Sequence, residues 1–241
     1  MIIRLAMCFL ISFIYCGDSF AAEYFFIIHL DNKEIKYTKD IYDFNESIEK
    51  VQQVYPKEIF KTTIEGIELL VLRADPEKSN LRDLFYLQRI DNVWEGLDYE
   101  YATDEWADEV LIHDVDKDSV NEVITVWSGE EEYEIRVNKI IKKNKRLIKE
   151  RIYSSPSLLI PSFTDDHYEY YDYGRTAVIH NGTALFVYGQ QIIDKGSVIT
   201  INKKSILTIN PKDPNKKIYL KPLGDTTLEE WKSFQAERVK K

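Results

Sequence analysis

The sequence of 241 residues contains only two cysteines, Cys8 and Cys16, and both lie near its N-terminus. The rest of the chain has no thiol, which excludes thiol catalysis, cysteine-ligated zinc and disulfide bonds there. A protein without disulfides must be stabilised by its hydrophobic core or by a bound metal, if it works outside the cell.

Motifs of common enzyme classes are also missing. The sequence has no Gly-x-Ser-x-Gly nucleophile elbow, no glycine-rich phosphate loop and no His-Glu-x-x-His zinc motif. Its four histidines are scattered along the chain. These absences favour a protein without catalytic activity. Because an acidic chain offers many carboxylate pairs, a carbohydrate-active enzyme stays open as an alternative.

The N-terminus has the pattern of a signal peptide. Arg4 supplies a positive charge, and the apolar run 5–15 that follows it is too short for a bilayer, which needs ~20 apolar residues. Ser19 and Ala21 are small residues at positions −3 and −1 of a cleavage site. The sequence therefore predicts a signal peptide over 1–21 and a periplasmic or secreted protein with no membrane span.

Strand-like segments dominate the rest of the sequence. They are rich in β-branched and aromatic residues and are separated by turn signals. These segments are 24–30, 34–42, 59–64, 67–72, 84–90, 110–113, 123–127, 133–141, 147–153, 176–179, 184–188, 197–201 and 206–209. Capping-box spacing predicts a helix over 43–55 and a terminal helix that begins near Thr226, with Glu229 as its partner.

This order of elements predicts a mainly β fold, an antiparallel meander or sandwich with accessory short helices and a C-terminal helix. The segment 154–162 contains two prolines and is the expected linker. We therefore expect a signal peptide over 1–21, a main β-rich domain with an acidic loop over 22–155, and a small β subdomain plus C-terminal helix over 156–241.

The most specific local pattern is an acidic loop between two strand-like segments. Carboxylates occupy its relative positions 1, 3, 5 and 9, namely Asp114, Asp116, Asp118 and Glu122. Hard cations such as Ca²⁺ require several oxygen ligands from a short, tightly turned loop, and alternate residues of such a loop converge. The spacing therefore predicts a structural Ca²⁺ site with these four side chains as ligands.

The pattern resembles the calcium loop of FG-GAP (integrin α-like) repeats, where Asp-x-Asp-x-Asp-Gly-x-x-Asp lies between two strands. The resemblance covers residues 110–127 and implies a bound calcium ion. Ser119 stands where that family has glycine, and serine has no easy access to positive φ. A degenerate copy near 67–87 repeats the spacing at Asp75, Glu77, Ser79 and Asp83. Coincidence and duplication explain this repeat equally well.

Negative charge is concentrated in residues 91–134, called here the acidic region. It holds sixteen acidic residues and one base, Lys117, for a net charge of −15. The net charge of the whole chain is −9, so the residues outside the acidic region have a net charge of +6. The overall negative charge argues against nucleic acid as a partner. Three of the four tryptophans also lie here.

An acidic surface with aromatic anchors suits docking onto a basic protein. The candidate partner-binding residues are Trp94, Tyr99, Tyr101, Trp106, Glu130, Glu131 and Glu132. The other interpretation is that the tryptophans fill the core while the acids face water, since half-buried strands alternate in this way.

Together these features predict an exported, Ca²⁺-stabilised, β-rich binding module without catalytic activity. A protein partner is expected, and a carbohydrate ligand is the other option, because the segment 165–173 contains four tyrosines. The alternatives are a periplasmic inhibitor or toxin-immunity protein that docks a basic target through the acidic region, and a carbohydrate-active enzyme.

Overall fold

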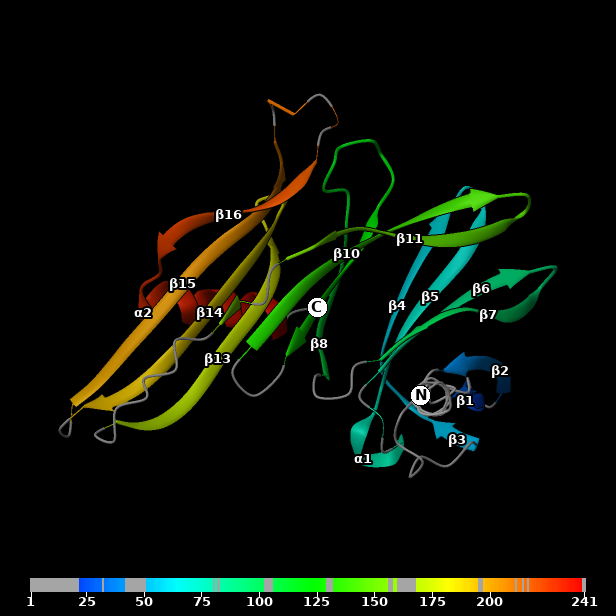
Figure 1. The fold of residues 1–241 in the computed structure, drawn as a ribbon, viewed down its shortest axis with the longest axis horizontal. Coiled ribbons are helices and arrows are strands. Elements are labelled where there is room, and N and C mark those ends of the chain that lie inside the picture. Colours follow the sequence, from blue (N-terminus) through cyan, green and yellow to red (C-terminus); the bar gives the residue numbers. More distant parts are fainter. Residues whose placement is uncertain are drawn as a thin grey trace, which may run out of the picture.

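The structure is a computed structural model of the chain. The residues that it describes are 22–31, 33–41, 51–79, 81, 83–101, 106–128, 132–155, 158–159, 168–194, 197–210, 212–213, 215 and 217–239. The predicted signal peptide lies outside these residues. The fold is mainly β, with four sheets and two helices in the described part, and this confirms the predicted fold class (Figure 1).

The first sheet contains strands β1 (Ala22–Leu30), β2 (Lys33–Ile41) and β3 (Val51–Val54). β1 and β2 form the expected antiparallel hairpin, whereas β3 runs parallel to β1. The helix predicted over 43–55 is therefore wrong at 51–54, and its residues 43–50 lie outside the described part. Pairing with β1 buries Val54 completely, and this tertiary contact overrides the helical spacing of the apolar residues.

The second sheet is an antiparallel meander in chain order. Its strands are β4 (Pro56–Ile64), β5 (Ile67–Ala74), β6 (Leu84–Ile90) and β7 (Val93–Glu100), and helix α1 (Pro76–Ser79) lies between β5 and β6. Three of these strands were predicted. Strand β7 was not, because Gly96 and its acidic neighbours interrupt the β-branched and aromatic pattern.

The third sheet is a similar meander, and it carries the acidic loop. Its strands are β8 (Trp106–His113), β9 (Glu122–Ser128), β10 (Glu132–Lys143) and β11 (Arg146–Ser154), with the short β12 (Leu158–Leu159) paired to β10. All four main strands contain a predicted segment. The acidic loop joins β8 to β9, the first two strands of this sheet.

The fourth sheet is the expected C-terminal meander. Its strands are β13 (Tyr168–His180), β14 (Thr183–Asp194), β15 (Ser197–Ile209) and β16 (Ile218–Asp225), followed by helix α2 (Leu228–Val239). β15 unites two segments that were predicted as separate strands. β16 was not predicted.

The capping box of α2 lies one residue later than predicted. Thr227 Oγ1 accepts a hydrogen bond from the Glu230 amide at 3.1 Å, and Glu230 Oε2 accepts one from the Thr227 amide at 3.0 Å. The hydroxyl of Thr226 also donates to Glu230 Oε2. These hydrogen bonds, with a contribution from Lys204, lower the pKa of Glu230 to about 2.

The hydrophobic core runs through the molecule as a series of shared clusters. One cluster joins the first and second sheets, the next joins the second and third, and another joins the third and fourth. Phe234 of α2 packs on the fourth sheet. The sheets therefore follow one another in chain order, as the colour sequence in Figure 1 shows. Among the described residues, no helix combines the length and apolarity needed to cross a membrane.

Candidate metal centre

The four predicted ligands come together at the tip of the β8–β9 hairpin. Carboxylate oxygens of Asp114, Asp116, Asp118 and Glu122 all lie within 4.8 Å of one another. The first three belong to the loop, and Glu122 begins β9. This group of oxygen ligands could hold a metal ion, as the spacing predicted.

Backbone amides hold the loop carboxylates in place. Asp114 accepts hydrogen bonds from the amides of Asp118 at 3.1 Å and Ser119 at 2.9 Å. Asp118 in turn accepts one from the amide of Val120 at 2.9 Å. These short-range bonds fold the loop back on itself, so the convergence of its carboxylates is a local property of the sequence.

Ser119 adopts a left-handed backbone conformation, with φ at 71°. This is the position at which the FG-GAP pattern has glycine. An L-residue with a Cβ atom is strained in this region by roughly 1–2 kcal/mol. Ser119 therefore has a backbone conformation that glycine adopts more easily than serine.

Replacing Ser119 by glycine is expected to raise the free energy of unfolding by about 0.5–1 kcal/mol. The gain is the relief of left-handed strain, reduced by the greater entropy of glycine in the unfolded chain. Urea denaturation in the absence of divalent ions measures this difference. Ser119→Ala keeps the Cβ atom and should bring no gain; equal changes in the two variants would contradict the explanation.

Glu122 is completely buried and is only half satisfied by hydrogen bonds. Its Oε2 atom accepts a bond from the Val115 amide at 2.7 Å, whereas Oε1 accepts none from the described residues. Burial raises the pKa of Glu122 to about 7, against the lowering effect of the Val115 bond, and Asp116 adds to the rise. A buried carboxylate oxygen without a hydrogen bond is costly, so a cation or a proton close to this atom would stabilise the folded protein.

A fifth side chain, Lys139 of β10, reaches the same group of oxygens. Its Nζ lies 2.8 Å from Asp116 Oδ2, contacts Asp118 Oδ2 and lies 3.8 Å from Glu122 Oε1. Burial lowers the pKa of Lys139, but the hydrogen bonds to Asp116 and Asp118 outweigh this effect and raise it. The same contact is the main cause that lowers the pKa of Asp118.

Lys139 was missed in the sequence because it does not belong to the loop. The pairing register of β9 with β10 is the signal that could have placed Lys139 beside the loop. Asn138 lies opposite Val123, so the next pair along the ladder brings Lys139 beside Glu122. Reading this neighbour from the sequence would have required the exact pairing of β9 with β10.

The upstream window with similar spacing has a different structure. It lies between β5 and β6, the second and third strands of its sheet, and contains helix α1. Asp75 Oδ1 accepts a bond from the Glu77 amide at 3.1 Å, and Ser79 Oγ accepts one from the Tyr55 amide at 2.7 Å. The two windows therefore connect different strands in their sheets.

Asp83, the last residue of that window, is buried with Tyr99. The Tyr99 hydroxyl donates to Asp83 Oδ2 at 2.7 Å. Burial raises the pKa of Asp83 to about 6, and the Tyr99 bond only partly opposes this rise. At a given pH, Asp83 is therefore protonated to a greater extent in the folded protein than in the unfolded chain.

This pKa predicts a loss of stability as the pH rises. The folded-state value exceeds the unfolded value of about 3.9, so the folded protein binds more protons between about pH 4 and 6. Stability from this group is complete below pH 4 and falls by roughly 2–3 kcal/mol as the pH passes 6. Asp83→Asn should remove this fall in the free energy of unfolding with pH and should be more stable than the wild type at pH 7. Asp91 is exposed, so Asp91→Asn should show the same pH dependence as the wild type. Denaturation at a series of pH values measures both variants.

Much of the acidic region is neutralised within the molecule. Among the residues that the structure describes, at least seven of its acidic side chains form ion pairs with bases outside the region. These acids are Glu95, Asp98, Glu100, Asp116, Asp118, Glu122 and Glu134. Their partners are Lys39, Arg136, Lys139, Arg146, Lys149 and Arg151. The net charge of −15 therefore overstates the negative charge that this surface offers to a partner.

The candidate partner-binding aromatics lie in different environments. Trp94 and Tyr99 pack against the core cluster of the first two sheets, and Tyr101 is 38% exposed and stacks on Tyr99 at 5.5 Å. Trp106 begins β8 and Glu132 begins β10, but their side chains lie outside the described part. Glu130 and Glu131 also lie outside it. Trp127 is completely buried, as the core interpretation of the tryptophans expected.

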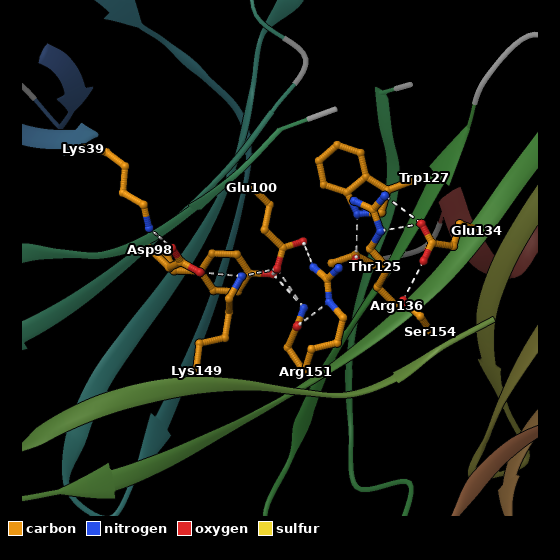
Figure 2. Close-up of polar contacts among 12 residues, drawn as sticks. Lys39, Asp98, Glu100, Thr125, Trp127, Glu134, Arg136, Lys149, Arg151 and Ser154 are labelled. Atoms are coloured by element: carbon orange, nitrogen blue, oxygen red, sulfur yellow. Dashed lines mark hydrogen bonds and ion pairs between the residues drawn. The ribbon is translucent and has the colours of Figure 1, made fainter. Parts of the chain in front are cut away.

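A buried polar network joins the second and third sheets (Figure 2). At its centre, Glu100 of β7 contacts Lys149, and its Oε2 lies 3.3 Å from Arg151, both on β11. Asn138 of β10 and the hydroxyl of Tyr86 also donate to Glu100 Oε1. The sequence carried no signal for this centre, because Glu100 and the four residues around it come from four strands of two sheets.

No protein-family model, no curated protein and no solved structure matches this chain. The interpretation of the acidic loop therefore depends on its own geometry and chemistry.

Proposed function

We propose that this chain is an exported, β-rich binding module without catalytic activity, whose acidic loop holds Ca²⁺ for structure. The observation that carries the proposal is the buried carboxylate of Glu122. Its Oε1 accepts no hydrogen bond from the described residues, and an oxygen of this carboxylate lies within 4.8 Å of oxygens of the three aspartates. An ion bound there would satisfy this atom. It would also offset the repulsion among four carboxylates.

The chemistry of the ligands favours Ca²⁺ over other metals. The cluster contains carboxylate oxygens and neither histidine nor cysteine, and such hard ligands suit Ca²⁺ or Mg²⁺ better than zinc or copper. Mg²⁺ demands near-ideal octahedral geometry and releases its water reluctantly, whereas Ca²⁺ accepts irregular carboxylate sites. Three ligands from one loop and one from the following strand form an irregular site.

The structural role follows from the position of the loop. It joins the first two strands of the third sheet, and that sheet contributes to the core clusters on both of its faces. An ion at the hairpin tip would hold β8 and β9 in register. It would thereby stabilise the packing of the second and fourth sheets against them.

Calorimetry and thermal unfolding with added Ca²⁺ test the proposed site. We expect a dissociation constant on the order of 10⁻⁴–10⁻³ M, as in extracellular modules. Saturation at 10 to 100 times that constant would stabilise the protein by about 1.4–2.7 kcal/mol. Asp116→Asn should abolish the effect, whereas Asp213→Asn should keep it, since Asp213 forms a similar local turn outside the cluster.

The absence of both binding heat and a rise in melting temperature would overturn the calcium site. Export is tested separately, by mass spectrometry of the protein recovered from the periplasm or medium. A chain that begins at Ala22 supports export with cleavage after Ala21. A chain that is retained inside the cell with residues 1–21 intact contradicts it.

A further inference from the structure

The lysine beside the acidic loop occupies the place that a cation would take. The Lys139 ammonium contacts Asp116 and Asp118, and its distance to Glu122 Oε1 is 3.8 Å. These are three of the four proposed calcium ligands. The fourth, Asp114, is held by backbone amides of the loop.

The ammonium and a divalent ion cannot occupy this place together. Calcium binds carboxylate oxygens at 2.3–2.6 Å, and Nζ already lies 2.8 Å from Asp116 Oδ2. Two cations that share the same oxygens would lie close enough for strong repulsion. Binding of a metal therefore requires Lys139 to leave the carboxylates.

We infer that Lys139 is a tethered cation that competes with the divalent ion for the acidic loop, and that this competition sets the affinity and the apo stability of the site. The inference rests on the proposed calcium site. It assigns Lys139 as an affinity-determining residue, which lies in β10 and outside the loop pattern.

The structure provides a route for this exchange. The Lys139 side chain is 18% exposed, and its partner Asp118 is 41% exposed. The long, flexible side chain can move its ammonium into water while its methylene groups stay against the strand. On this inference the loop has two closed states, one held by the ammonium and one held by the metal, and each places a positive charge among the carboxylates.

Calorimetric titration with Ca²⁺ of the wild type and of Lys139→Met tests the inference. Methionine keeps much of the length and the apolar stem but removes the charge. We expect Lys139→Met to bind Ca²⁺ at least about tenfold more tightly than the wild type, and to melt at a lower temperature without Ca²⁺. Lys142→Met is the matched control, because Lys142 lies on the same strand and its Nζ binds the Glu65 carbonyl. It should behave as the wild type does.

The outcomes separate the inference from the proposed function. Equal Ca²⁺ affinity in the wild type and in Lys139→Met would overturn the competition and leave the calcium site standing. Binding in neither protein would overturn both. Tighter binding in Lys139→Met, with no change in Lys142→Met, supports the inference.

A measurement on the wild type covers the case in which Lys139→Met does not fold. The lysine ammonium groups are observed by proton–nitrogen NMR, with the Lys139 signal assigned from Lys139→Arg. An ammonium held in ion pairs exchanges slowly and is visible, so the Lys139 signal should disappear or shift as Ca²⁺ is added. Ca²⁺ binding that leaves this signal unchanged would overturn the inference.

Discussion

Replacing Glu100 by glutamine is expected to lower the free energy of unfolding by about 3 kcal/mol. The side chain of Glu100 is only 5% exposed, and it faces the ammonium of Lys149 and the guanidinium of Arg151. Glutamine has nearly the same shape but no charge, and its amide group would direct hydrogen atoms at these bases. Breaking a buried ion pair on one side costs about 3–5 kcal/mol, because the other charge stays buried.

The lower end of that range is expected because part of the network would survive. Lys149 also pairs with Asp98 at 2.6 Å, and Figure 2 shows Asp98 linking it to Lys39. The double variant Glu100→Gln with Lys149→Met also removes the ammonium that has lost its partner Glu100, so it should recover part of the lost stability. This compensation identifies an uncompensated charge, and not lost packing, as the cause.

Urea denaturation measures both variants, with Glu95→Gln as the matched control. Glu95 lies on the same strand and pairs with Arg146 at 3.2 Å, but the two side chains are 35% and 64% exposed. Such a surface pair contributes no more than about 1 kcal/mol. Equal losses in Glu95→Gln and Glu100→Gln would contradict the importance of burial.

Replacing Gly96 by alanine is expected to destabilise the protein by about 2–3 kcal/mol. A Cβ atom at this position would lie 1.9 Å from Cδ2 of Tyr37 and 2.4 Å from its Cε2. The Tyr37 ring belongs to β2 and packs beside Phe26 in the core that joins the first and second sheets. Overpacking of a filled core costs about 1–3 kcal/mol, since the ring must move away from its neighbours.

A double-mutant cycle with Tyr37→Ala tests this cause. Truncating the ring removes the obstacle, so Gly96→Ala should cost less than about 1 kcal/mol in the Tyr37→Ala background. Each variant is measured by guanidinium denaturation. If Gly96→Ala is as harmful without the ring as with it, the clash with Tyr37 is not the reason for the glycine.

Gly96 also shows why β7 was not recognised in the sequence. A glycine within a strand weakens the β-branched and aromatic pattern that predicts a strand. Here the absence of a Cβ atom leaves room for the Tyr37 ring, which comes from another sheet. The wrong helix over 51–54 has the same kind of cause. The apolar residues there have helical spacing, but pairing with β1 decides their conformation. Where no distant partner intervened, as in the hairpins of the third sheet, the strand predictions were confirmed.

The acidic loop was predictable because its ligands lie close together in the sequence. Asp114, Asp116 and Asp118 converge through hydrogen bonds that span five residues or fewer. The amide of Ser119 takes part even though its backbone is left-handed. Local turn chemistry therefore explains how these carboxylates come together, and Lys139 of β10 adds a contact from outside the loop.

The sequence by itself determined a mainly β chain, a group of converging carboxylates and an uneven distribution of charge. Only the tertiary structure decided which cation each carboxylate meets. Lys139 reaches the loop from a neighbouring strand, and Lys149 and Arg151 reach Glu100 from a different sheet. Coulombic attraction depends on distance in space and not on separation along the chain. For this reason, folding pairs many acids of the acidic region, which has a net charge of −15, with bases from the rest of the chain, which has a net charge of +6.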